Sequence, residues 1–113
     1  MKKIIVFLIL VLFVEGVSAA YIEISGPNDG DTVDGTVTIN INGRDASSSL
    51  DKVWVCIDHS SCSGNAKCYD STPDNKDPAT TCSWNTGSYS DGPYTIRVEG
   101  ETFSGQKLSD DIS

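Results

Sequence analysis

Short segments in which apolar and polar residues alternate restrict the fold of this chain more than any other feature. Between residues 36 and 42, for example, Val37, Ile39 and Ile41 share one face of an extended strand. A period of two is typical of antiparallel sheets that bury one face. Clusters of Gly, Pro, Asn and Asp separate these segments. We therefore expect an all-β sandwich of two antiparallel sheets, with about seven short strands near 21–25, 36–42, 52–58, 66–70, 80–85, 93–99 and 107–113.

The first twenty residues have the pattern of a secretory signal peptide. Two lysines precede an apolar run over residues 4–14, and residues 17–19 supply the small side chains of a cleavage site. The alternative is a retained membrane anchor, but a spanning helix needs about 20 apolar residues, roughly twice this run. We expect residues 1–20 to be removed, which leaves residues 21–113 as one secreted or cell-surface domain without membrane insertion.

The acidic composition argues against two classes of partner. The chain has 16 Asp and Glu against 8 Lys and Arg, a net charge of −8. Nucleic acids and anionic lipids are bound through clustered basic residues, which this composition does not favour. We expect neither partner, and we interpret the dispersed charge as an aid to solubility outside the cell.

Four cysteines, Cys56, Cys62, Cys68 and Cys82, all lie beyond the leader. In a small exported chain an even number of cysteines predicts disulfides, here two. A zinc site is the alternative, but zinc sites favour closely paired cysteines, and the only histidine, His59, stands alone. We therefore expect oxidised cysteines and no zinc.

Three segments in order resemble the immunoglobulin-like domains of secreted and cell-surface prokaryotic proteins. The first runs from Ile22 to Ile39 with Pro27, Asp29-Gly30 and Gly35-Thr36-Val37, the second covers Lys52 to Asp58, and the third contains Ser83-Trp84-Asn85-Thr86 and Asp91-Gly92-x-Tyr94-Thr95. One departure is Asn85, where the family usually has Asp. The resemblance implies an immunoglobulin-like sandwich, with Trp84 in the core between the sheets, and a role in adhesion or structural spacing.

Side-chain direction favours one pairing of the cysteines. Loop entropy is about equal for Cys56–Cys68 with Cys62–Cys82 and for the rival Cys62–Cys68 with Cys56–Cys82. Cys56 points away from the apolar face of its strand, so Cys82 across the core is hard to reach. A hairpin turning near Cys62 would bring Cys68 opposite Cys56. A similar pair in some members of the resembled family supports Cys56–Cys68, which leaves Cys62–Cys82.

The best candidate site is an aromatic pair on an outer sheet face. Trp54 alternates with Val53 and Val55 and therefore faces outward, where Tyr69 on the next strand could lie beside it. Such a pair could stack on a sugar ring or anchor a partner protein. The alternative is an outer-face tryptophan that a neighbouring loop or disulfide covers.

Catalysis and metal binding have weaker sequence support. His59 has no evident nucleophilic partner, so its loss should not affect function. The loop carboxylates, among them Asp29, Asp31 and Asp34, hint at Ca²⁺ but fit Asx turns as well. We expect a non-enzymatic module without a cofactor that binds a protein or glycan at the cell surface. The alternatives are a carbohydrate-binding module centred on Trp54 and Tyr69, and a small secreted hydrolase or hydrolase inhibitor, for which no motif is present.

Overall fold

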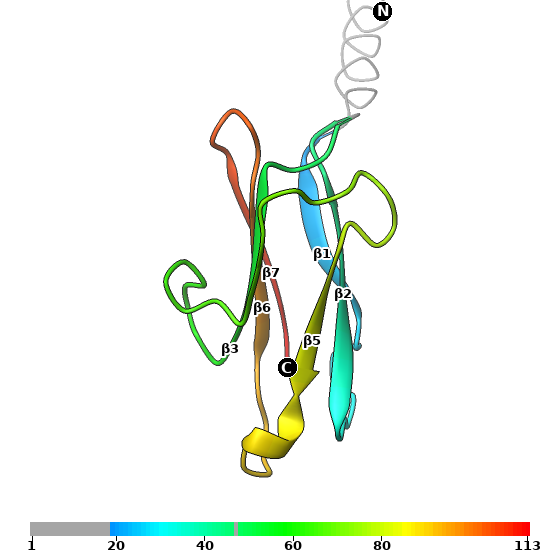
Figure 1. Ribbon diagram of the computed structural model, residues 1–113, viewed down its shortest axis with the longest axis vertical. Helices are drawn as coiled ribbons and strands as arrows, with labels where there is room; N and C mark the ends of the chain where they lie inside the picture. Colours follow the sequence, from blue (N-terminus) through cyan, green and yellow to red (C-terminus); the bar gives the residue numbers. More distant parts are fainter. Residues whose placement is uncertain (1–18, 47) are drawn as a thin grey trace, which may run out of the picture.

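The structure is a computed structural model that describes residues 19–46 and 48–113. It consists of two antiparallel sheets packed face to face (Figure 1). All but the last two residues of the predicted signal peptide lie outside the described residues. Within the described part of the chain, no helix is long and apolar enough to cross a membrane.

Seven strands form the sandwich, which confirms the predicted fold class. Their bounds are β1 Tyr21–Gly26, β2 Thr36–Arg44, β3 Lys52–Ile57, β4 Cys68–Asp70, β5 Thr80–Asn85, β6 Ile96–Glu101 and β7 Lys107–Ile112, with a short 3₁₀ turn, η1, at Thr86–Ser88. The three-stranded sheet has the order β1-β2-β5, and the four-stranded sheet has the order β4-β3-β6-β7. Two strands begin later than predicted, β4 at Cys68 and β6 at Ile96.

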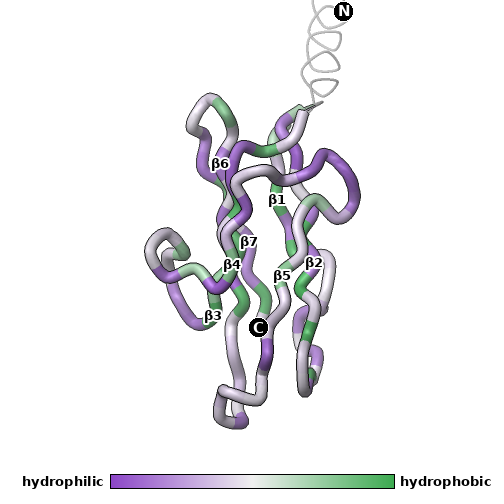
Figure 2. The backbone as a smooth tube through the Cα atoms, in the orientation of Figure 1, coloured by the Kyte–Doolittle hydropathy of each residue, from purple (hydrophilic) through white to green (hydrophobic). Residues whose placement is uncertain are grey.

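The core lies between the two sheets and takes the apolar residues of each alternating strand. Ile39, Val55 and Val98 are fully buried, and the hydrophobic segments in Figure 2 follow the strands. Trp84 is only 2% exposed and contacts Tyr89 and Tyr94 edge to face, with ring centroids 5.4 and 5.9 Å away. The core position that the resemblance implies for Trp84 is therefore confirmed.

Two glycines leave room for large side chains in the core. A Cβ atom on Gly43 would lie 2.7 Å from Cδ1 of Leu50, and one on Gly100 would lie 2.8 Å from Cδ1 of Ile22. Contacts this short do not occur between real side chains, so any larger residue would displace the leucine or the isoleucine. These glycines are core-packing positions in strands β2 and β6.

One side of the sandwich is closed by hydrogen bonds between β1, the segment after it, and β7. The backbone N–H of Ile24 donates to the Asp110 carboxylate at 3.0 Å. Further along, the N–H of Gly30 donates to the carbonyl of Ser113 at 2.7 Å, and the N–H of Ser113 donates to the Asp29 carboxylate at 2.6 Å. These three bonds join the two sheets along one edge.

The other side is closed by a disulfide, and here the predicted cysteine pairing is wrong. The structure pairs Cys68 with Cys82 and Cys56 with Cys62, with Cα–Cα distances of 5.9 and 5.3 Å. The predicted bonds Cys56–Cys68 and Cys62–Cys82 are absent, because all four cysteines are paired otherwise. The bond from Cys68 on β4 to Cys82 on β5 joins the two sheets.

The register between β3 and β4 explains this correction. Cys68 lies opposite Val55, whose side chain is buried in the core, and not opposite Cys56. Residues that lie opposite each other point to the same face of a sheet, so Cys68 points inward and reaches Cys82. Cys56 does point outward, as predicted, and its partner is Cys62 in the loop that follows its own strand.

Candidate functional site

Trp54 and Tyr69 lie together on the outer face of the four-stranded sheet, in the positions that the strand pattern predicts. They are direct neighbours on β3 and β4. Their ring centroids are 5.5 Å apart and the ring planes are tilted by 31°. Tyr69 is 53% exposed, whereas Trp54 is half-buried. The pair therefore offers aromatic surface to solvent beside a more enclosed indole ring.

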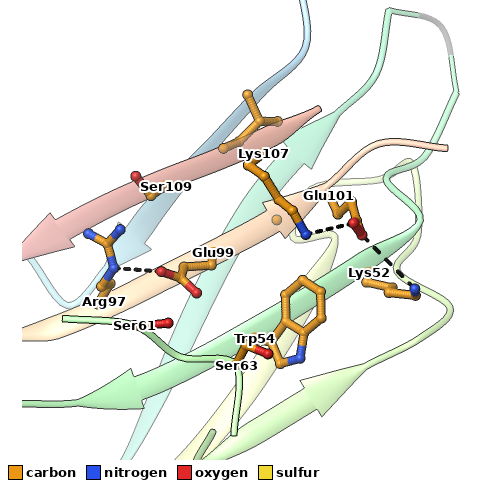
Figure 3. Close-up of a pocket in the computed structure, with 11 residues that line it drawn as sticks. Lys52, Trp54, Ser61, Ser63, Arg97, Glu99, Glu101, Lys107 and Ser109 are labelled. Carbon is orange, nitrogen blue, oxygen red and sulfur yellow. Dashed lines mark hydrogen bonds and ion pairs between the residues drawn. The ribbon is translucent and has the colours of Figure 1, made fainter. Parts of the chain in front are cut away.

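Lysine side chains and a shared carboxylate surround the indole ring of Trp54 (Figure 3). The Lys107 ammonium lies 5.7 Å from the ring centroid, within the range of a cation–π interaction. It also donates a hydrogen bond of 2.7 Å to Glu101, which lies 4.0 Å from the Lys52 ammonium. The hydrogen bond from Lys107 holds the pKa of Glu101 below its ordinary value. This carboxylate therefore stays ionised between its two lysines.

A second ion-pair group lies further along β6. Arg97 donates to Glu99 at 2.9 Å and to Asp111 at 3.1 Å. The bond to Glu99 raises the pKa of Arg97. Burial alone would raise the pKa of Glu99, but the N–H of Cys62 and the Arg97 guanidinium outweigh it and hold that pKa below its ordinary value. This group keeps its charges in a fixed arrangement beside the aromatic pair.

The loop between β3 and β4 forms a wall over this face of the sheet. The Cys56–Cys62 disulfide folds the loop back onto its own strand, and the N–H of Cys62 donates to Glu99 at 2.9 Å. Ser61 and Ser63 then face the ion pairs of β6 (Figure 3). The wall and the sheet enclose a hollow of about 560 Å³. Its lining is Lys52, Trp54, Ser61, Ser63, Arg97, Glu99, Gly100, Glu101, Lys107, Leu108 and Ser109.

We call this space the outer-face hollow. Three of its lining residues, Lys52, Arg97 and Lys107, are cationic, although the whole chain has only 8 Lys and Arg and a net charge of −8. Sequence reasoning found Trp54 and Tyr69 but not the ion pairs or the wall. The available signal was alternation, since Lys52, Arg97 and Glu99 each alternate with core residues. Tyr69 itself does not line the hollow but lies beside it.

The other sequence candidates do not form a site in the described residues. His59 is exposed in the loop after β3. The carboxylates of Asp31 and Asp34 each accept a backbone N–H within their own turn, whereas that of Asp29 accepts the N–H of Ser113. Within residues 19–46 and 48–113, no group of three or more His, Cys, Asp or Glu side chains is placed to hold a metal ion. The three carboxylates that hinted at Ca²⁺ thus each accept a backbone N–H.

A second hollow, of about 650 Å³, lies at the end of the sandwich near η1. Trp84, Tyr89 and Tyr94 line it, and these rings contact one another. The Trp84 Nε1 atom is buried and has no hydrogen-bond partner within the part of the chain that the structure describes. Because its aromatic lining is the core cluster itself, we assign this hollow to packing.

Comparison with known proteins agrees with this architecture. The family model described as a bacterial Ig domain matches residues 21–98, from the start of β1 into β6. No curated protein and no solved structure matches the chain significantly. The match covers more than half of the chain and coincides with the two-sheet sandwich. The chain therefore belongs to the bacterial Ig domain family.

Proposed function

We propose that this protein is a non-enzymatic extracellular module that acts in adhesion at the cell surface. The observation that carries the proposal is the outer-face hollow. A structural spacer needs only a stable sandwich, whereas this sheet face has a disulfide-tethered wall, an aromatic floor and fixed ion pairs. Such preorganised polar groups around an apolar surface are typical of binding sites.

An extracellular location supports this role. The family and the two disulfides fit a protein outside the cytoplasm. The signal-peptide pattern of residues 1–20 predicts that the domain is exported from the cytoplasm. Intact-mass measurement on protein from the culture medium tests export and cleavage, and a species that still contains Met1 would contradict it.

A glycan is the ligand class that the aromatic pair favours. The apolar face of a sugar ring packs well on an indole, and Trp54 with Tyr69 forms such a surface. Sugar hydroxyls both donate and accept hydrogen bonds, so they suit a lining in which Lys52 and Glu101 lie within 4.0 Å of each other. This is the second candidate function, carbohydrate recognition, at the same site.

The two roles can be separated by one set of variants. Beads coated with the purified protein should adhere to surfaces of producing cells, and Trp54→Ala should reduce that adhesion by about tenfold or more. Tyr69→Ala tests the second ring of the aromatic pair. Its matched control is Tyr21→Ala, because both tyrosines are exposed on strands but Tyr21 lies on the other sheet.

A glycan array then identifies the ligand class. Binding to sugars that Trp54→Ala abolishes would support carbohydrate recognition. Adhesion without any sugar binding would support a protein partner. If the native protein shows neither adhesion nor sugar binding, the domain is a spacer and the proposal fails.

A further inference from the structure

The four edge strands of the sandwich differ in how they are protected from pairing with another chain. β4 is only 3 residues long. β1 has a register shift between Ile24 and Gly26, and the Ile24 N–H is occupied by Asp110. β7 carries Lys107 and Asp111 on its exposed positions. Short length, irregularity and charge are the usual means of blocking an edge.

β5 has none of these protections. It is 6 residues long, contains no charged residue and no proline, and pairs with β2 without a register shift. An exposed edge of this kind can accept another strand. β5 is therefore the one edge, among the described strands, that combines length, regularity and neutrality.

The register shows which backbone groups of β5 point to the open side. The N–H of Thr86 donates to the carbonyl of Gly35, in line with the β2–β5 ladder. Hydrogen-bonded pairs alternate along antiparallel strands, so every second residue of β5 bonds to β2 and the others point away. The backbone groups that point away belong to Thr81, Ser83 and Asn85, whose side chains are exposed, and the Asn85 carbonyl already accepts the Ser88 hydroxyl at 3.2 Å. Within the described residues, the backbone of Thr81 and Ser83 makes no hydrogen bond beyond this ladder.

We infer that β5 pairs with β5 of a second copy of this chain, antiparallel and centred on Ser83. The two three-stranded sheets then become one six-stranded sheet. Antiparallel pairing about a two-fold axis makes the strand its own partner, since residue 83 meets residue 83 and residue 81 meets residue 85. The outward residues of β5 are polar and uncharged, so no like charges meet in this arrangement.

Charge does not oppose a second copy at this edge, because neither chain presents a charge along the seam. Two chains with a net charge of −8 repel each other, except where neither presents a charge. Where β2 pairs with β5, the outward side chains of both strands are uncharged. They are Thr36, Thr38, Asn40, Thr81, Ser83 and Asn85.

The pairing has a geometric consequence for the hollow. A two-fold axis perpendicular to the shared sheet keeps both four-stranded sheets on the same side of it. The two outer-face hollows would then face the same direction, so one dimer could bind a surface twice. Because a seam of six residues per chain is small, we expect a weak dimer, with a dissociation constant of about 10 μM or weaker.

Sedimentation equilibrium of the purified protein over a wide concentration range tests the inference. The native chain should show a reversible monomer–dimer equilibrium. Ser83→Lys should weaken it by about tenfold or more, because two lysines would meet at the centre of the seam. Thr38→Lys is the matched control, since Thr38 lies directly opposite Ser83 on β2 and adds the same charge one strand away from the seam. It should leave the dimer intact.

A charge swap makes the test independent of any folding defect. Ser83→Lys and Ser83→Glu should each be monomeric, and an equal mixture of the two should form a heterodimer.

A native chain that stays monomeric up to about 1 mM would overturn the inference, as would a dimer that Ser83→Lys leaves unchanged. Equal loss of the dimer in Ser83→Lys and Thr38→Lys would also overturn it, because the sheet face and not the edge would then be the interface. None of these measurements depends on adhesion or sugar binding, so failure here leaves the proposed function standing.

Discussion

Trp84 and Trp54 place the same side chain in two different regions of one sandwich. Trp84 faces inward from β5, is 2% exposed, and contacts the rings of Tyr89 and Tyr94 in the core. Trp54 faces outward from β3, with Tyr69 on one side and the Lys107 ammonium 5.7 Å from its ring. The comparison shows that strand alternation separates buried from outward-facing side chains, residue by residue.

The largest expected effect distinguishes these two tryptophans. Trp84→Ala leaves a cavity in the core and should lower the free energy of unfolding by about 3–5 kcal/mol. Trp54→Ala should lower it by about 1 kcal/mol or less, because its ring is only partly buried. Chemical denaturation of both variants measures the difference. Similar losses of unfolding free energy for both variants would contradict this prediction, because Trp54 would then stabilise the fold as much as Trp84 does.

The disulfide between the sheets should have the next largest effect. Replacing Cys68 and Cys82 together by Ala removes a cross-link over 14 residues, worth about 3 kcal/mol in the chain-entropy model. The outer-face hollow should persist, since neither cysteine lines it. Denaturation midpoints measure the stability, and quenching of Trp54 fluorescence reports the hollow. A large increase in quenching would contradict this separation.

The disulfide of the wall should act mainly on the hollow. Replacing Cys56 and Cys62 by Ala removes a cross-link over only 6 residues, worth about 2 kcal/mol. The amide of residue 62, which donates to Glu99, should then exchange its hydrogen faster. His59→Ala, in the same loop, is the control and should keep both the stability and the slow exchange. Unchanged protection of residue 62 in the double variant would mean that the wall forms without its disulfide.

Acid should produce the smallest effect, and again on the outer face. The pKa values of Glu99 and Glu101 are held below their ordinary values, so their ion pairs stabilise the folded state above the unfolded pKa. That contribution is lost as the pH falls through the lowered, folded-state pKa values. Thermal unfolding between pH 7 and about pH 3 should show a falling midpoint.

Glu99→Gln should flatten part of this fall, whereas Glu23→Gln, on the three-stranded sheet, should not. The comparison assigns the acid sensitivity to one face of the sandwich. An identical profile for the native protein and Glu99→Gln would exclude the Glu99 pair as its source.

Alternation was sufficient to predict the seven strands and the outward direction of Trp54, whereas the inward direction of Trp84 was implied by the family resemblance. Alternation depends only on the period of two along each strand, which burial of one face enforces. The disulfides depend on register between strands, and a shift of one residue reverses every side chain. Two of our predictions were in fact incompatible, because adjacent residues on β4 cannot both face outward. With Tyr69 outward, Cys68 must face the core, and this places it beside Cys82.

The ion pairs and the wall could not be predicted for a different reason. The ion pairs among Lys52, Glu101 and Lys107 form only because β3, β6 and β7 are neighbours in that order. The alternation within a single strand does not predict the order of strands in a sheet. The wall depends on the Cys56–Cys62 bond, which the predicted pairing excluded.

The hydrogen bonds that close the β1–β7 side also determine how the domain resists a pull on its ends. β1 and β7 run in the same direction, with Tyr21 at one end of the sandwich and Ser113 toward the other (Figure 1). Tension between these residues pulls β1 and β7 past each other along their length. The hydrogen bonds at Ile24 and Ser113 lie across this direction and are loaded together, in shear. Bonds that must break together raise the barrier to forced unfolding more than bonds that open in succession. A domain pulled at these two residues would therefore resist the load with its sheets still joined.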